Sequence, residues 1–272
     1  MTTVAIQGEL GAFSHEAALR LLGEPEHVLA CRTFEDLFDA VVSGHADLGI
    51  VPVENTLAGS VQRAMDLLVE HPLHAVGETR VPIRLCLAAP PDTELADLRT
   101  VASHPVALQQ CLRFFRAHPH LAPAAAYDTA GSVKELMEGG AAWDAAVGSA
   151  LAARLYGAEI LAENIEDHEH NYTRFLAVAR DPAPVPEAGA KTSLAFVLGN
   201  TPGSLYQALG CFARHDVDLS RIESRPIPGR PWEYRFFVDA RGAAPEAQEH
   251  AAEELRGVVN DVRVLGCYAE AP

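Results

Sequence analysis

The chain has 272 residues, of which 49% are hydrophobic and 21% charged, and its net charge is −16. This composition is that of a folded globular protein with enough apolar material for a core, and it excludes a disordered chain. The acidic excess creates no field that would attract nucleic acid or an anionic membrane surface, so neither is expected as a partner. A small anionic substrate remains compatible with this charge, because helix N-termini and one or two arginines can bind a carboxylate locally.

Location and cysteine usage give a consistent expectation. No apolar run approaches the roughly 20 residues that cross a bilayer. The stretch M-T-T-V-A-I-Q-G lacks the basic head and apolar centre of a signal peptide, so we expect a cytoplasmic protein. The five cysteines are widely spaced without a C-x-x-C pair, which predicts neither a disulfide framework nor a zinc site. We interpret them as small buried apolar residues.

Short apolar runs alternate with amphipathic segments through the first 180 residues, which is typical of βα units around a mostly parallel sheet. In chain order, the predicted strands cover residues 4–7, 46–53, 83–88, 100–103 and 145–148. The predicted helices cover residues 14–22, 34–43, 59–70, 106–116, 131–138 and 150–156. Ser14 is the expected N-cap of the first helix and Gly23 its end.

Polar clusters follow these strands at the strand-to-helix junctions. They are G-A-F-S-H at 11–15, V-E-N-T-L-A-G-S at 53–60, S-H-P at 103–105, D-T-A-G-S at 128–132 and G-S at 148–149. Open α/β sheets bind their ligands at the carboxyl ends of strands. The sequence therefore predicts that these clusters meet in one cleft.

A proline-rich seam at residues 179–191 separates a second, shorter part of the chain. That part predicts strands over 192–198, 218–224, 232–239 and 262–268, and helices over 203–215 and 245–259. The order βαββαβ is that of the ferredoxin-like arrangement. By analogy, such a terminal domain is expected to be regulatory or associative.

Several well-known sites have no motif in this chain. It contains no G-x-G-x-x-G, G-x-x-x-x-G-K-[ST], G-x-S-x-G or H-E-x-x-H, which excludes the dinucleotide, nucleotide-triphosphate, hydrolase and zinc-protease signatures. The run D-H-E-H at 167–170 has metal-binding side chains, but adjacent ligands in a loop do not converge on one ion, and we interpret it as a solvated loop. We expect no metal and no cofactor.

The clusters are rich in hydroxyls and poor in strong acids and bases. The hydroxyls are Ser14, Thr56, Ser60, Ser103, Thr129, Ser132, Ser149 and Thr173, accompanied by Asn55, Gln110, Asn171 and Arg174. Singly, each hydroxyl is more often a helix cap than a ligand, and Ser14, Ser103 and Thr129 occupy expected cap positions. Together they predict a site that binds an oxygen-rich anion through neutral donors, with Arg174 as the candidate carboxylate partner.

The stretch N-Y-T-R-F-L-A-V at 171–178 has three competing interpretations. It contains an N-x-T glycosylation sequon, but glycosylation presupposes secretion, for which nothing in the sequence speaks. It also fits a strand with a polar start, or part of an active site that contains Thr173 and Arg174. The residues alone leave the last two open.

These motifs resemble those of a known family. In chain order, the first part contains G-E-L-G-A-F-S-H-E-A-A, V-P-V-E-N-T-L-A-G-S-V, S-H-P-V-A-L-Q-Q-C, D-T-A-G-S-V-K, A-A-V-G-S and N-Y-T-R-F, and the second N-T-P-G-S-L-Y-Q-A-L and I-E-S-R-P-I-P. The first set resembles bacterial prephenate dehydratases, which convert prephenate to phenylpyruvate in phenylalanine biosynthesis. The second set resembles the phenylalanine-binding motifs of ACT regulatory domains. The resemblance covers nearly the whole chain.

The resemblance implies a domain organisation. The expected fold is α/β, with a two-lobed, periplasmic-binding-protein-like catalytic domain over residues 1–180 and an interlobe cleft. Lobe one is expected at 1–78 with 160–180, and lobe two at 79–159. A linker at 181–190 and a ferredoxin-like ACT domain at 191–272 are expected to follow.

The resemblance also implies residue roles in a lyase reaction that removes water and CO2 from prephenate. Thr173 is expected to donate to the departing hydroxyl. The other expected catalytic residues are Asn55, Ser103 and Gln110. The expected substrate-binding residues are Arg174, Phe175, Ser14, Glu54, Thr56, Gly59, Ser60, Thr129, Ser149 and Asn171. The sequence pattern itself predicts that Phe175 packs in the core, because it begins an apolar run.

For regulation, the resemblance implies that phenylalanine binds the second domain across the interface of a homodimer or homotetramer. The expected binding residues are Asn200, Gly203, Ser204, Leu205, Glu223, Ser224, Arg225 and Pro226. Two alternatives accompany this expectation. The pieces D-T-A-G and A-G-S are similar to plant-type enzymes that use arogenate, and a cleft with a ligand-binding domain also suits a non-catalytic amino-acid sensor.

Overall fold

The computed structural model describes residues 2–271. The chain divides into two compact units, Met1–Met65 with Thr79–Phe175, and Asp66–Glu78 with Leu176–Pro272. The outermost residues of the two predicted domains, 1 and 272, lie outside the described residues. None of the helices within 2–271 has the combined length and apolar character that a membrane span requires.

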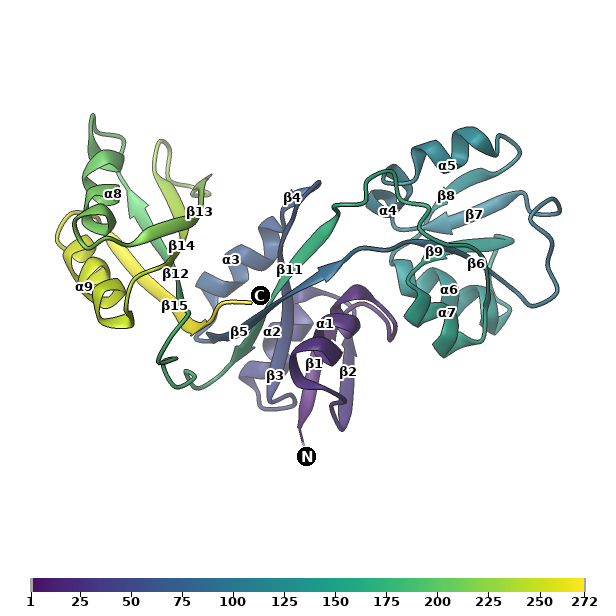
Figure 1. Ribbon diagram of the computed structural model, residues 1–272, viewed down its shortest axis with the longest axis horizontal. Helices are drawn as coiled ribbons and strands as arrows, with labels where there is room; N and C mark the ends of the chain where they lie inside the picture. Colours follow the sequence, from purple (N-terminus) through teal and green to yellow (C-terminus); the bar gives the residue numbers. More distant parts are fainter. Residues whose placement is uncertain (1, 272) are drawn as a thin grey trace. The chain divides into compact units, whose positions relative to one another are not determined.

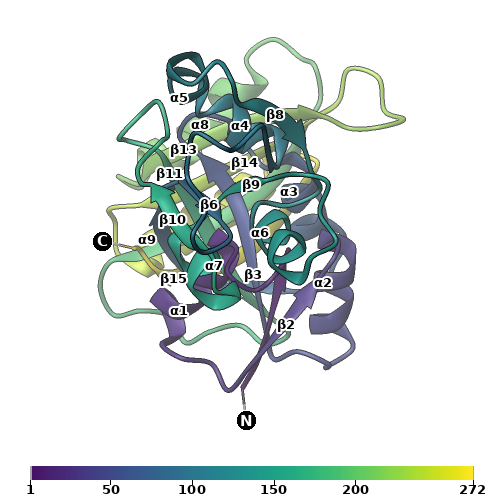
Figure 2. The same ribbon diagram turned by 90° about the vertical axis from the view of Figure 1, so that its right-hand side faces the viewer.

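The first sheet has the strand order β2-β1-β3-β11-β5, with the short β4 paired to β3. Its strands are β1 (Thr3–Gln7), β2 (His27–Cys31), β3 (Leu48–Asn55), β4 (Gly59–Ser60), β5 (His74–Pro82) and β11 (Tyr172–Ala179). β1 runs parallel to both β2 and β3. The helices of this region are α1 (Phe13–Leu22), α2 (Phe34–Val42) and α3 (Gln62–Glu70), and α1 and α2 pack against β1 and β3 (Figures 1 and 2).

The second sheet has the order β10-β6-β9-β7-β8 and mixes parallel and antiparallel pairs. Its strands are β6 (Cys86–Ala89), β7 (Thr100–Ser103), β8 (Ala122–Ala125), β9 (Ala145–Gly148) and β10 (Glu159–Ala162). Its helices are α4 (Pro105–Gln109), α5 (Leu112–Ala117), α6 (Thr129–Glu138) and α7 (Ala150–Tyr156).

Helices cover both faces of this second sheet (Figure 1). Successive residues of β6 and β9 alternate between two apolar clusters, one containing residues of α4 and α5 and the other residues of α6 and α7. Because successive strand side chains point to opposite faces, the strands are apolar throughout and read as continuous hydrophobic runs.

The second unit contains a four-stranded antiparallel sheet of order β13-β14-β12-β15. The elements follow the chain as β12 (Ala190–Leu198), α8 (Ser204–Arg214), β13 (Asp218–Pro226), β14 (Tyr234–Arg241), α9 (Pro245–Arg256) and β15 (Asp261–Ala269). Apolar residues of α8 and α9 share one core cluster with alternate residues of β12 and β14, so both helices cover the same face of the sheet (Figure 1). The predicted βαββαβ order is confirmed.

Two predicted helices differ from the structure. The helix predicted over 106–116 is divided into α4 and α5 at Cys111, and the Asp167 carboxylate accepts hydrogen bonds from the first backbone N–H groups of α5. The helix predicted over 59–70 begins only at Gln62. Gly59 has φ +81°, outside the right-handed helical region, and it pairs with β3 as part of β4.

The stretch Tyr172–Ala179 is strand throughout, so the segment that was expected as either a strand with a polar start or part of an active site is a strand from Tyr172. The return from the second sheet also comes later than expected, because β10 pairs with β6 and so belongs to that sheet. Residues 180–189, between β11 and β12, form no helix or strand.

Candidate functional site

A cavity of about 480 Å³ lies in the first unit, lined by residues from both of its sheets. Six residues named from the sequence line it: Asn55, Gly59, Ser60, Gln110, Thr129 and Thr173. Asn55, Gly59 and Ser60 come from the 53–60 cluster and Thr129 from the 128–132 cluster, whereas Gln110 and Thr173 lie outside the five expected clusters. With Phe13 and His104, four of those five clusters reach the cavity wall. The apolar part of the wall includes Phe13, Phe34, Ile83 and Leu85.

Strand alternation selects which side chains reach this cavity. β3 and β11 are neighbours in the sheet, and each ends or begins with adjacent polar residues. Asn55 and Thr173 line the cavity. Glu54 precedes Asn55 and Arg174 follows Thr173, so both lie on the opposite side of the sheet from these two residues. There the Arg174 Nε is 3.5 Å from a Glu54 carboxylate oxygen.

A chain of side-chain amides connects the two sheets at the cavity. Asn55 Nδ2 donates to Asn171 Oδ1 at 2.8 Å and to Thr173 Oγ1 at 3.0 Å, with a longer contact of 3.2 Å to the Tyr172 carbonyl. Asn171 Nδ2 donates in turn to Gln110 Oε1 at 3.0 Å. Asn171 has no exposed surface, so this hydrogen-bond chain is largely sealed from water at its centre.

The direction of this amide chain is fixed from one end. Asn55 Oδ1 accepts from the backbone N–H groups of Leu57 and Ala58 at 3.0 and 2.7 Å. Backbone N–H groups can only donate, so the Asn55 oxygen must face them and its nitrogen must face Thr173 and Asn171. Asn171 must then present its nitrogen to Gln110, which accepts through its oxygen.

This polarity leaves two donors at the cavity. Thr173 Oγ1 receives a hydrogen bond from Asn55, and its own hydroxyl hydrogen has no acceptor among residues 2–271. Gln110 uses its oxygen for Asn171, and its Nε2 has no hydrogen-bond partner in the same range. Both residues line the cavity, so both donors are available to an oxygen atom of a ligand.

His104 adds a third donor that was not named from the sequence. Its Nδ1 accepts from the Val106 backbone N–H at 3.3 Å and caps α4. The neutral ring then carries its hydrogen on Nε2. His104 lines the cavity and belongs to the S-H-P motif, so its signal was present in the sequence.

Asn171 and Thr56 hold the two sheet connections in register. The Asn171 carbonyl accepts from the Ile83 backbone N–H at 2.8 Å. Thr56 Oγ1 donates to the His170 carbonyl and accepts from the Tyr172 backbone N–H. Neither residue is part of the cavity wall. They position the β3 end and the β11 start, which carry Asn55 and Thr173.

Six other residues expected at the site lie outside the cavity wall. Three are hydroxyls that donate to backbone carbonyls: Ser14 to Gln7, Ser103 to Val147 and Ser149 to Gly11. Phe175 is 3% exposed and packs in the core, as its apolar run predicted, and Arg174 is held on the other face of β11. Glu54 shares that face, and it too is absent from the wall.

The expected helix caps at Ser14, Ser103 and Thr129 are wrong. The N-cap residues of these three helices are Ala12, His104 and Asp128. In each case the N-cap residue lies one or two positions away from the hydroxyl, and in α6 the Asp128 carboxylate accepts from the Gly131 N–H instead. Ser149 is a cap, because its hydroxyl accepts from the Ala152 N–H.

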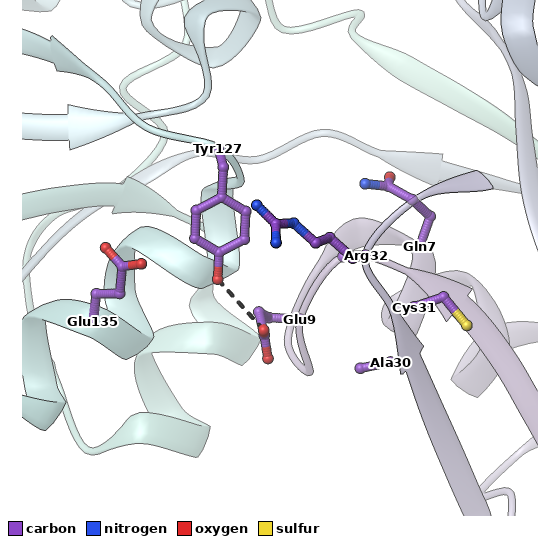
Figure 3. Close-up of a pocket in the computed structure, with 8 residues that line it drawn as sticks. Gln7, Glu9, Ala30, Cys31, Arg32, Tyr127 and Glu135 are labelled. Carbon is purple, nitrogen blue, oxygen red and sulfur yellow. Dashed lines mark hydrogen bonds between the residues drawn. The ribbon is translucent and has the colours of Figure 1, made fainter. Parts of the chain in front are cut away.

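A second cavity of about 440 Å³ in the same unit is lined by Gln7, Glu9, Arg32, Tyr127 and Glu135, among others (Figure 3). Beside it, Glu9 binds two residues around α6, accepting from Lys134 Nζ at 2.9 Å and from the Tyr127 hydroxyl at 3.4 Å. Burial and then the Glu9 and Asp128 carboxylates raise the pKa of Tyr127, which keeps its hydroxyl protonated as a donor. We interpret this as a clamp between the β1–α1 loop and α6.

No cluster of three or more His, Cys, Asp or Glu side chains suited to a metal ion occurs in the part of the chain that the structure describes. In the D-H-E-H run, Asp167 caps α5 as described above. The residues expected to bind phenylalanine lie at one end of the second unit's sheet, where Leu198, Tyr234 and Pro226 are in register across β12, β14 and β13.

Comparisons with known proteins place the chain in a family. The family model of prephenate dehydratase matches residues 4–183. Arogenate dehydratase/prephenate dehydratase 1 of Arabidopsis thaliana is 37% identical over 281 residues, covering 97% of this chain and 71% of the relative.

Two solved structures are similar over 99% of the chain. One is a prephenate dehydratase from Arthrobacter aurescens in complex with L-Phe, with 32% identity, 90% of that chain covered and a TM-score of 0.90. The other is GqqA, described as a novel type of quorum quenching acylases, with 37% identity, 98% coverage and a TM-score of 0.89. The family model covers more than half of the chain, and the chain therefore belongs to the prephenate dehydratase family.

Proposed function

We propose that this protein is a prephenate dehydratase, a lyase that converts prephenate to phenylpyruvate, water and CO2 in phenylalanine biosynthesis. The observation that carries the proposal is the amide chain from Gln110 to Thr173. It leaves the Thr173 hydroxyl hydrogen and Gln110 Nε2 as donors at a cavity that also has an apolar wall. Such a cavity suits a cyclohexadiene ring that carries a leaving hydroxyl and carboxylates.

The reaction consumes one proton and needs no oxidant or reductant. The bond between the ring and its carboxylate breaks, CO2 leaves, and the electron pair moves into the ring. The bond between the ring and its hydroxyl breaks at the opposite position, and the departing oxygen takes a proton to leave as water. The new aromatic ring supplies the driving force, so the enzyme contributes orientation and a donor at the leaving oxygen.

In this scheme Thr173 acts on the leaving hydroxyl. A threonine hydroxyl is too weak an acid to surrender its proton outright, so it donates a hydrogen bond and relays a proton from solvent. Asn55 orients it by occupying one of its lone pairs. Gln110 Nε2 and the His104 Nε2 hydrogen bind carboxylate oxygens, assisted by Ser60 and by Thr129 in the first turn of α6.

We assign residues 1–180 to a two-lobed catalytic domain, 181–190 to a linker and 191–272 to an ACT regulatory domain. The strand order of the second unit and the L-Phe complex of the Arthrobacter relative support this assignment. Phenylalanine binds this domain in a homodimer or homotetramer, at the sheet end that carries Asn200, Gly203, Ser204 and Leu205 on one side and Glu223, Ser224, Arg225 and Pro226 on the other. Light scattering with and without phenylalanine tests the oligomer.

The function is tested by incubating the purified full chain with prephenate and quantifying phenylpyruvate by chromatography. A parallel incubation with arogenate measures phenylalanine formation, because the Arabidopsis relative carries both activities in its description. We expect phenylpyruvate to form well above the rate in buffer alone. Product from neither compound, with phenylalanine still bound, would replace this proposal with the non-catalytic sensor.

Amide hydrolysis is a second candidate activity, favoured by the similarity to GqqA. A nucleophilic hydroxyl needs a base beside it. Thr173 has instead the donor nitrogen of Asn55, and its hydroxyl oxygen has no other hydrogen-bond partner among the described residues, so the geometry favours the dehydratase. Release of free amine from a fatty N-acyl amide by the same preparation measures this second activity.

A further inference from the structure

The segment Asp66–Glu78 belongs by its contacts to the second unit, although the chain on either side of it belongs to the first. It comprises the second half of α3 and the first half of β5. Three basic side chains of the C-terminal sheet bind it, namely Arg225 of β13, Arg263 of β15 and Lys191 of β12. Basic side chains of the C-terminal sheet therefore contact this segment at its beginning, its middle and its end.

The first of these three contacts is an ion pair within the second unit. Arg225 Nη1 lies 2.6 Å from the Asp66 carboxylate, and both side chains are mostly buried. Arg225 follows directly after Glu223 and Ser224 on β13. It is thus one residue both of the sheet end proposed to bind phenylalanine and of the contact with α3.

The second contact is made with the turn between α3 and β5. The Arg263 guanidinium donates to the backbone carbonyls of Val69 and His71, at the C-terminal end of α3. These carbonyls lack partners inside a helix, and a cation is favourable there. Close by, a Cβ atom added to Gly266 would stand 2.0 Å from the Ala75 carbonyl oxygen, so β15 packs directly on the β5 backbone.

The third contact is a buried ion pair. Lys191 Nζ lies 2.7 Å from the Glu78 carboxylate, with side-chain exposures of 3% and 0%. The same carboxylate oxygen accepts from the Ala271 backbone N–H at 2.9 Å. β5 is therefore fixed to the C-terminal sheet at Glu78, four residues before Pro82 ends the strand.

At both ends of the segment Asp66–Glu78 the chain continues into the wall of the candidate active-site cavity. Gly59, Ser60 and Val61 line the cavity and immediately precede α3. Ile83 and Leu85 line it and follow β5. A displacement of the segment is transmitted through a helix and a strand, which are stiff elements, to two sides of the wall.

We propose that Asp66–Glu78 transmits the ligand occupancy of the C-terminal domain to the active-site cavity, with the Arg225–Asp66 ion pair as its switch. This inference rests on the proposed function and names the regulation of that site. The ligand is an amino acid whose carboxylate competes with Asp66 for the Arg225 guanidinium. Loss of the ion pair changes the hold on α3 and so moves the Gly59–Val61 wall.

The test compares the full-length wild type with Asp66→Asn and with a matched control, Asp218→Asn. Asp218 pairs with Arg241 in the same domain at 3.0 Å but touches neither α3 nor β5 in any described contact. Phenylalanine binding is measured by calorimetry, its effect on phenylpyruvate formation by initial rates, and its effect on the wall by hydrogen–deuterium exchange of peptides covering 57–61 and 83–87.

Asp66→Asn removes the ion pair permanently, so we expect its turnover without phenylalanine to equal that of the wild type with saturating phenylalanine. Phenylalanine binding should be no weaker, since its competitor for Arg225 is neutralised. The response of rate to phenylalanine should fall by about tenfold or more, which is the usual size of an allosteric coupling. Exchange in the two wall peptides should respond to phenylalanine in the wild type and in Asp218→Asn, and not in Asp66→Asn.

The exchange measurement separates this inference from the proposed function. A wild type that makes no phenylpyruvate contradicts the function alone, because the wall peptides still report the coupling. The coupling is overturned if wild-type wall peptides ignore saturating phenylalanine, if the wild type does not bind it, or if Asp66→Asn responds as the wild type does.

Discussion

At the scale of single residues, the candidate site depends on the direction of hydrogen bonds more than on charge. Two backbone N–H groups fix the Asn55 oxygen, and this sets the orientation of Asn171 and Gln110 in sequence. Asn55, Asn171, Gln110 and Thr173 are all neutral, so the donors at the cavity exist only because the three side-chain amides point the same way along the hydrogen-bond chain. Reversing one amide should reverse the others.

Asn55→Asp makes that reversal without changing shape. The second carboxylate oxygen accepts from the Thr173 hydroxyl and from Asn171 Nδ2, which turns Gln110 Oε1 toward the cavity and removes both donors. We expect kcat/KM for prephenate to fall at least about 100-fold, the usual contribution of a positioned proton donor. Asn260→Asp, in the turn before β15, adds the same charge and should keep normal turnover. Wild-type kinetics for Asn55→Asp would refute the orientation argument.

Sequence reasoning found the members of this site better than their arrangement. Thr173, Asn55 and Gln110 were named from their motifs, but Arg174 was expected in the cavity beside Thr173. Adjacent residues of one strand face opposite sides, and that rule excludes one of the two as soon as Tyr172 is known to be in the strand. Ser14, Ser103 and Ser149 lie outside the cavity wall and donate to backbone carbonyls, and a buried hydroxyl that binds a carbonyl has the same local sequence as one that binds a ligand.

At the scale of elements, the β1–α1 loop is held by the loops of the second sheet. Besides the Glu9 clamp, the Gly11 carbonyl accepts from Ser149. Gly11 has φ +89°, and a Cβ atom there would stand 2.6 Å from the Ala152 Cα atom. Only glycine allows this approach between α1 and α7, so the loop and the helix fix each other.

Gly11→Ala should therefore destabilise the protein by about 2–4 kcal/mol, combining overpacking with left-handed backbone strain. Gly139 is the matched control, because it has φ +82° but nothing within 4 Å of an added Cβ atom. Gly139→Ala should cost about 1 kcal/mol from backbone strain alone. Urea denaturation of the three proteins measures the difference, and equal costs for the two variants would contradict the packing argument.

The elements were largely predictable where periodicity was strong, and the clamp was not. Strands at 100–103 and 145–148 and the βαββαβ order follow from apolar runs and are confirmed. The clamp joins Glu9 to Lys134, residues 125 apart in the chain, and no local pattern encodes such a pair. The predicted helix at 59–70 starts late, at Gln62, because Gly59 has a positive φ that is incompatible with a helix interior.

At the scale of the whole molecule, the two units exchange chain segments. Asp66–Glu78 packs with the C-terminal sheet although a linear boundary near residue 180 was expected from the proline-rich seam. Composition locates a seam in the sequence but gives no information on which sheet a helix end joins in space. The buried Lys191–Glu78 ion pair is the strongest evidence of this exchange.

Breaking this ion pair from one side should be costly. Glu78→Gln leaves a buried lysine with Glu270 as its nearest remaining carboxylate, at 3.2 Å, and should lower the free energy of unfolding by about 3 kcal/mol. The double variant Glu78→Met with Lys191→Met removes both charges and should be less destabilised than either single variant, because no unpaired charge is buried. Thermal and urea unfolding measure both effects, and purely additive costs would show that the pair is not coupled.

The most direct test of the account is the turnover of prephenate by Thr173→Val compared with Thr173→Ser in the full-length protein. Valine keeps the shape of threonine without a hydroxyl, while serine keeps the hydroxyl that Asn55 orients. We predict that Thr173→Val forms phenylpyruvate at least about 100-fold more slowly than the wild type, while Thr173→Ser stays within about tenfold. Wild-type turnover by a folded Thr173→Val protein would contradict the role of the Thr173 hydroxyl and with it the central claim.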